Sequence, residues 1–127
     1  MASIFISRVR NEFERYSREI DDKIHLPNLK IETQENFINT GETQSKLNEY
    51  ISSCDMVVHL VGDITGHIPT SREELKEVTS FLNANPKILA QFEWMNDHKV
   101  LKTISLTQWE AWLALYHEKQ LIISQPA

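Results

Sequence analysis

Hydrophobic and polar residues follow two different periods along this chain, and the periods predict alternating strands and helices. Short apolar or alternating runs predict strands at residues 3–7, 29–33, 56–61 and 121–124. Apolar residues spaced by three and four predict helices at residues 8–24, 45–53, 71–83, 87–95 and 107–116. This alternation predicts an α/β fold, with a mainly parallel sheet of four to five strands and helices on both of its faces.

Breaks in the pattern predict the connections. Pro27 and Asn28 end the first helix, and residues 36–44 form a polar loop with Gly41 as its hinge. Residues 64–104 are less regular, which predicts a helical insertion before the last helix, with residues 96–103 as a mobile connection. We therefore predict one domain that spans residues 1–127.

Composition narrows the class of protein. A 127-residue chain with 41% hydrophobic and 24% charged residues, and no long apolar run, indicates a soluble globular protein without a signal peptide or a membrane span. Cys54 is the only cysteine, which excludes an internal disulfide and favours a cytoplasmic location. The net charge of −5, with basic residues interspersed among acidic ones, argues against nucleic-acid binding.

The most informative residue is Glu110, which lies in an aromatic helix that leads directly into the last strand. Open α/β sheets usually bind their ligand at the carboxyl edge, and a carboxylate there can stabilise the cation that develops when a sugar–base bond breaks. The alternative is structural. Thr107 and Glu110 have the spacing of a capping box, in which Glu110 would only satisfy backbone donors of its own helix.

Other chemistry is less well supported by the residues. His59 and His67 lack a nearby third metal ligand, so a buried, hydrogen-bonded His59 is the better interpretation. Cys54 is next to Asp55, which makes it a poor nucleophile. The chain has no Gly-x-Gly-x-x-Gly and no P-loop motif, which argues against a dehydrogenase or a P-loop NTPase.

Several segments resemble the Toll/interleukin-1 receptor (TIR) superfamily, and in particular a bacterial TIR-like subgroup. The resemblance covers essentially the whole chain and rests on motifs that occur in the expected order. These motifs are Ile4-Phe5-Ile6-Ser7, Thr33-Gln34-Glu35-Asn36-Phe37, Cys54-Asp55-Met56-Val57-Val58, the run from Val57 to Asp63, and the helix from Thr107 to Tyr116.

The resemblance implies a flavodoxin-like TIR fold and cleavage of the nicotinamide–ribose bond of NAD. Glu110 falls at the position of the glutamate that is essential in TIR enzymes, and the product would be ADP-ribose or a cyclic form of it. NAD would be the substrate, and neither a further cofactor nor a metal is expected. The residues that would contact the substrate are Ser7, Arg8, Phe37, Asp63 and Trp109, although Phe37 and Trp109 also fit core packing, and Asp63 also fits a turn cap.

The resemblance also implies assembly. TIR-like domains of this subgroup usually sit at the N-terminus of larger bacterial defence or signalling proteins, and a complete domain has a fifth strand that is not seen here. We expect a domain truncated after its fourth strand, which associates with itself through the loop 36–44 and an open sheet edge. Two other functions stay open: a TIR-like interaction module without activity, and an enzyme similar to nucleoside 2-deoxyribosyltransferases.

Overall fold

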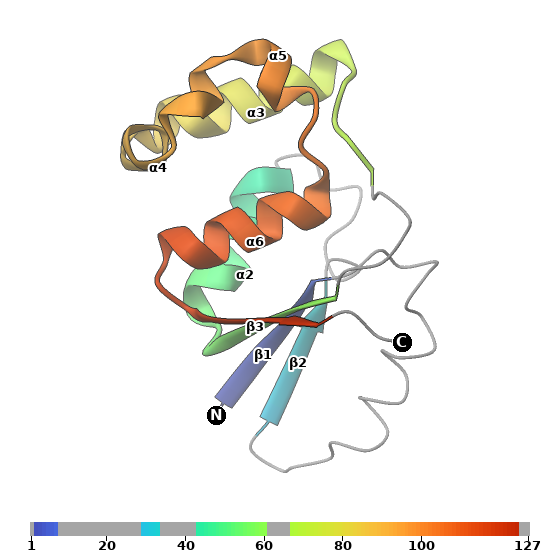
Figure 1. The fold of residues 1–127 in the computed structure, drawn as a ribbon, viewed down its shortest axis with the longest axis vertical. Helices are drawn as coiled ribbons and strands as arrows, with labels where there is room; N and C mark the ends of the chain where they lie inside the picture. The colour runs from blue at the N-terminus through green and yellow to red at the C-terminus, as the bar shows by residue number, and fades with distance from the viewer. Residues whose placement is uncertain (1, 8–28, 34–42, 61–66, 125–127) are drawn as a thin grey trace.

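The computed structural model describes residues 2–7, 29–33, 43–60 and 67–124. Within them, four parallel strands form one open sheet in the order β2-β1-β3-β4 (Figure 1). The strands are β1 (Ala2–Ser7), β2 (Leu29–Thr33), β3 (Met56–Leu60) and β4 (Gln120–Ser124). The predicted α/β class and parallel sheet are therefore confirmed.

The strand pairing brings the ends of β1 and β3 together. Ser7, the last residue of β1, lies opposite His59 of β3. Because side chains alternate along a strand, Phe5 and Val57 pack into the main core on one face of the sheet, whereas Ile6 and Leu60 form a separate small cluster on the other. Ser7 and His59 share the face of Phe5 and Val57.

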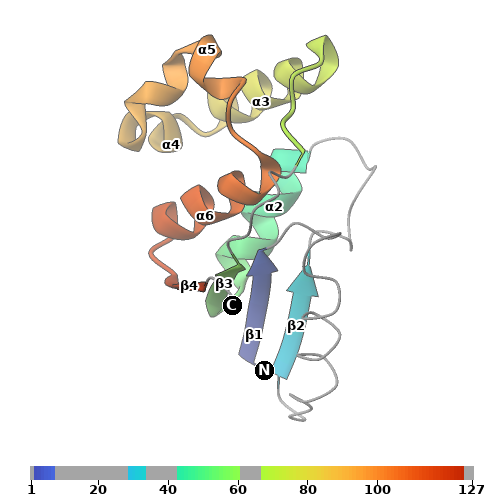
Figure 2. The same cartoon turned by 45° about the vertical axis from the view of Figure 1, so that its right-hand side comes forward.

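Two helices, α2 (Thr43–Ser53) and α6 (Leu106–Tyr116), cover this face of the sheet. A further helical layer lies on them, so α2 and α6 are enclosed between the sheet and that layer (Figures 1 and 2). The outer layer consists of α3 (Arg72–Ala84), α4 (Pro86–Gln91), the 3₁₀ helix η2 (Glu93–Asn96) and α5 (His98–Leu101). The helix predicted at residues 8–24 lies outside the described residues, so the expectation of helices on both faces of the sheet stays a prediction.

Local sequence signals account for most of the helix ends. Ser71 caps α3 and forms a capping box with Glu74, and Pro86 begins α4, a position where the missing N–H of proline has no cost. The connection predicted at 96–103 contains the short helix α5, which Asp97 caps by accepting a hydrogen bond from the Lys99 N–H. The loop predicted at 36–44 is two residues too long, because α2 begins at Thr43.

The helices of the described part of the chain are short. None of them has the length and apolar character that a membrane crossing requires.

Candidate active site

The start of α6 determines which way Glu110 faces. Ser105 is the N-cap: its Oγ accepts a hydrogen bond from the Gln108 N–H, and Gln108 Oε1 accepts one from the Ser105 N–H. The capping box is therefore Ser105–Gln108. The alternative of a Thr107–Glu110 box is wrong, because Thr107 already lies inside the helix and Glu110 is in its second turn.

α6 is apolar on nearly all sides because both of its faces are covered. On the side of the outer layer, the Trp109 ring meets Phe81 of α3 edge to face, with 6.2 Å between the ring centroids. Trp112 makes similar contacts with Phe92 and Trp94. Trp109 is completely buried in the core, so its position matches the packing interpretation. Its neighbour along the helix, Glu110, points instead toward the sheet.

Glu110 joins a buried polar cluster with Ser7 and His59. Both Ser7 and Glu110 have 0% exposed surface. The Ser7 hydroxyl donates to Glu110 Oε1 at 2.8 Å and lies 3.3 Å from the Thr107 carbonyl oxygen. Ser7 Oγ also lies 2.8 Å from His59 Nδ1. Three side chains, which are distant in the sequence and come from β1, β3 and α6, thus meet at one point.

The directions of these bonds are assigned from the protonation of His59 and from the acceptor of the Ser7 proton. Burial lowers the pKa of His59 from its ordinary value of 6.5, so the ring is neutral at neutral pH. A neutral imidazole carries one N–H, and the Ser7 proton is directed at Glu110. We therefore assign that hydrogen to Nδ1, so that His59 donates to Ser7 and Ser7 donates to Glu110.

This order of donors differs from a catalytic triad. In a serine hydrolase the serine donates its proton to histidine, whereas here the serine donates to a carboxylate and accepts from histidine. The arrangement orients one carboxylate oxygen and does not activate Ser7 as a nucleophile.

The cluster lies at the position where open parallel sheets bind ligands. The chain runs from β1 outward to β2 on one side and to β3 and β4 on the other, so the strand order reverses between β1 and β3. Crevices form outside the carboxyl ends of the strands at such a reversal. Ser7 and His59 lie on the two strands that flank it.

Three of the predicted substrate contacts, Arg8, Phe37 and Asp63, lie outside the described residues, as does most of the loop 36–44. His67 bonds Glu74 near the surface of the molecule and lowers the pKa of that carboxyl. Cys54 is buried, which raises its pKa, and Asp55 adds to this effect. In the described ranges, no three His, Cys, Asp or Glu side chains are grouped to hold a metal ion.

His59 is the member of the cluster that sequence reasoning did not assign to the site. It was expected to be buried and hydrogen-bonded, and it is partly buried and bonded to Ser7. The available signal was its position near the end of the third strand, which in a parallel sheet lies beside the end of the first. The strand register turns that position into a contact with Ser7.

This chain was compared with protein-family models, curated proteins and solved structures. No protein-family model matches this chain, and neither a curated protein nor a solved structure is similar enough to count as a match.

Proposed function

We propose that this chain is a TIR-like domain that cleaves the N-glycosidic bond of NAD, with Glu110 as the catalytic carboxylate. The sheet order β2-β1-β3-β4 agrees with the first four strands of a flavodoxin-like sheet, whose ligand binds between β1 and β3. The TIR-like sequence motifs, which include the ends of both strands, point to the same fold.

One observation carries the proposal: the Glu110 carboxylate is bonded to Ser7 at the carboxyl end of β1, beside β3. A glutamate that served only its own helix would lie at the helix start, where Ser105 and Gln108 already form the cap. Taking a carboxylate out of water has a large cost, and proteins rarely retain one without a partner or a function.

The chemistry requires little beyond that carboxylate. In NAD the nicotinamide ring is already cationic, so it leaves as a neutral molecule and the ribose acquires oxocarbenium character. A fixed carboxylate near C1′ or the ribose hydroxyls lowers the barrier electrostatically. Attack by water at C1′ then gives ADP-ribose, and attack by a group within the same molecule gives a cyclic product.

The other residues have supporting roles in this proposal. Ser7 holds Glu110 Oε1, and His59 holds Ser7, so both are positioning residues. Trp109 fixes the helix from the opposite side by packing on Phe81. Arg8 and Asp63 remain our candidates for contacts to the diphosphate and the ribose, and Phe37 for the loop that closes over the ligand.

Because Glu110 has no exposed surface, the proposal includes a conformational step that uncovers the carboxylate when substrate binds. In TIR enzymes such a site is completed by a neighbouring subunit. We therefore propose that the active form is an assembly of this domain, held in the cytoplasm within a larger bacterial defence or signalling protein.

The test is incubation of concentrated protein with NAD, followed by chromatography that separates nicotinamide, ADP-ribose and cyclic products. We expect nicotinamide to appear with one equivalent of an ADP-ribose product, and its release to be slower by on the order of a hundredfold or more with Glu110→Gln. A parallel incubation with a deoxynucleoside and a free base tests the deoxyribosyltransferase alternative. Base exchange there without NAD cleavage would replace our proposal with that function.

A second candidate function, an interaction module without activity, is favoured by the edge strand β4. β4 pairs only with β3 among the described strands, and its Ile122 and Ile123 side chains are 42% and 63% exposed. Open edges of this kind pair readily with other chains. Under this function the protein self-associates through β4 but leaves NAD intact at every concentration.

A further inference from the structure

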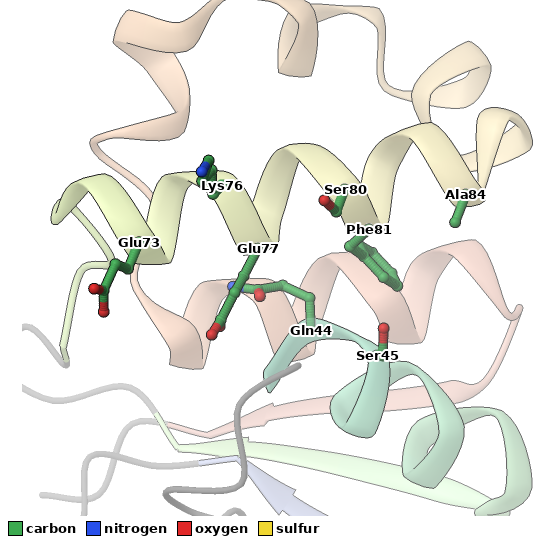
Figure 3. A pocket seen from close by; sticks show the side chains of 8 residues that line it. All are labelled: Gln44, Ser45, Glu73, Lys76, Glu77, Ser80, Phe81 and Ala84. Carbon is green, nitrogen blue, oxygen red and sulfur yellow. The ribbon is translucent and has the colours of Figure 1, made fainter.

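The helix α3 lies on the far side of α2 and α6 from the sheet (Figure 1). A groove of about 560 Å³ lies between α2 and α3 (Figure 3). Its volume falls within the range of small-molecule sites, roughly 300–1,000 Å³. It is lined by Gln44, Ser45, Glu73, Lys76, Glu77, Ser80, Phe81 and Ala84. None of these residues belongs to the Ser7–His59–Glu110 cluster.

Gln44 gives the groove an unsatisfied acceptor. Its side chain is only 2% exposed, and its Oε1 is buried without a hydrogen-bond partner among the described residues. A buried amide oxygen without a donor destabilises a fold, so such groups usually have a partner. A ligand that donates a hydrogen bond in the groove would supply that partner.

The charges beside Gln44 specify the kind of donor. Figure 3 shows Glu73 and Glu77 extending from α3 on the side of α2, whereas Lys76 extends from the other side of the helix. No ion pair of the described residues involves either carboxylate. The N-terminus of α2 adds only about half a positive charge, less than the two carboxylates carry. The donor that best fits this end is therefore cationic.

The other end of the groove is less polar. The Phe81 ring and the Ala84 methyl group lie there, one and two turns further along α3 from Glu77 (Figure 3). Phe81 also packs edge to face on Trp109, and only 4% of its surface is exposed. A ligand that spans the groove thus meets acceptors at one end and an apolar, aromatic surface at the other.

We propose that this groove binds a small organic cation, a primary amine or guanidine attached to an apolar or aromatic body. The ammonium or guanidinium group donates to Gln44 Oε1 and pairs with Glu77, and the body packs on Phe81. The site is separate from the one that we propose for NAD, and its occupation does not depend on NAD cleavage.

The experiment is isothermal titration calorimetry of the whole chain with phenethylamine at millimolar concentration, compared with the neutral analogue 2-phenylethanol. We expect saturable binding of the amine, and at least tenfold weaker binding of the alcohol. Glu77→Gln should weaken amine binding about tenfold, since a charged partner is lost, whereas Glu93→Gln, an exposed glutamate on η2, should leave it unchanged. Absence of saturable amine binding, or equal affinity for both compounds, would overturn the proposal.

Gln44→Leu provides a second, independent measurement. Replacing an unsatisfied buried amide by an apolar side chain of similar size should raise the melting temperature of the ligand-free protein and weaken amine binding. A variant that binds phenethylamine as tightly as the wild type would show that Gln44 takes no part in the site. If Glu77→Gln binds phenethylamine as tightly as the wild type, the Glu77 carboxylate takes no part in the site.

Discussion

The bond between Ser7 and Glu110 is the contact on which the candidate site depends, and its strength can be measured as a stability difference. Ser7→Ala removes a hydroxyl that donates to a fully buried carboxylate at 2.8 Å. Hydrogen bonds to charged groups contribute about 1.5–3 kcal/mol, and the lost oxygen leaves a small void. We expect a loss of about 2–3 kcal/mol in the free energy of unfolding, or roughly 7–11 °C in Tm for a domain of this size.

A double-mutant cycle separates this bond from other effects of the substitution. In a Glu110→Gln background, Ser7 donates to a neutral amide oxygen, and such a bond contributes only about 0.5–1.5 kcal/mol. Ser7→Ala should therefore cost about 1 kcal/mol less in that background than in the wild type. Urea unfolding of the four proteins gives the coupling directly.

The matched control is Ser80→Ala, which removes the hydroxyl of an exposed serine on α3 and should change stability by less than about 0.5 kcal/mol. Equal costs of Ser7→Ala in the two backgrounds would mean that Ser7 and Glu110 do not interact in solution. The candidate site would then lose its geometric basis.

Two further predictions concern pH and assembly. Burial lowers the pKa values of His59 and His117, so the unfolded chain binds more protons than the folded one as pH falls below about 6.5. The urea midpoint of unfolding should therefore fall as the pH is lowered below about 6.5, and it should fall less steeply for His59→Gln. A urea midpoint that rises as the pH falls would contradict this prediction. Ile123→Lys places a charge on the exposed edge strand β4 and should weaken self-association through it. Light scattering should then show a smaller rise of mass with concentration, and the specific activity should rise less on concentration. An unchanged mass profile would exclude association through β4.

The strand and helix pattern was predictable because it depends on local spacing. The apolar run at 56–61 predicted a central strand, and β3 lies between β1 and β4. Ser71 with Glu74 marked the start of α3 to the residue. The helix α5 within residues 96–103 was not predicted, because four residues are too few to show a period and its only signal is the cap Asp97.

The candidate site was predictable in part. The binding rule for open parallel sheets predicted Glu110 at the mouth of a cleft near Ser7. The two side chains are in contact, but Glu110 is fully buried and does not lie at an open mouth. The sequence placed His59 near the end of the third strand but could not pair it with Ser7, because strand register is set by the whole sheet. Thr107 was mistaken for the N-cap because two pairs have the spacing of a capping box, Thr107 with Glu110 and, two residues earlier, Ser105 with Gln108. The structure uses the earlier pair.

The measurement that tests the central claim most directly is the rate of nicotinamide release from NAD by the wild type and by Glu110→Gln at equal, high protein concentration. Gln keeps the size of the side chain and still accepts a hydrogen bond from Ser7, so both proteins should be folded, as their urea midpoints will show. If the carboxylate stabilises the oxocarbenium, the rate should fall by on the order of 10²–10³. A folded Gln variant that cleaves NAD at the wild-type rate, or a wild type that releases no nicotinamide at any concentration, would contradict the assignment of Glu110 as the catalytic group.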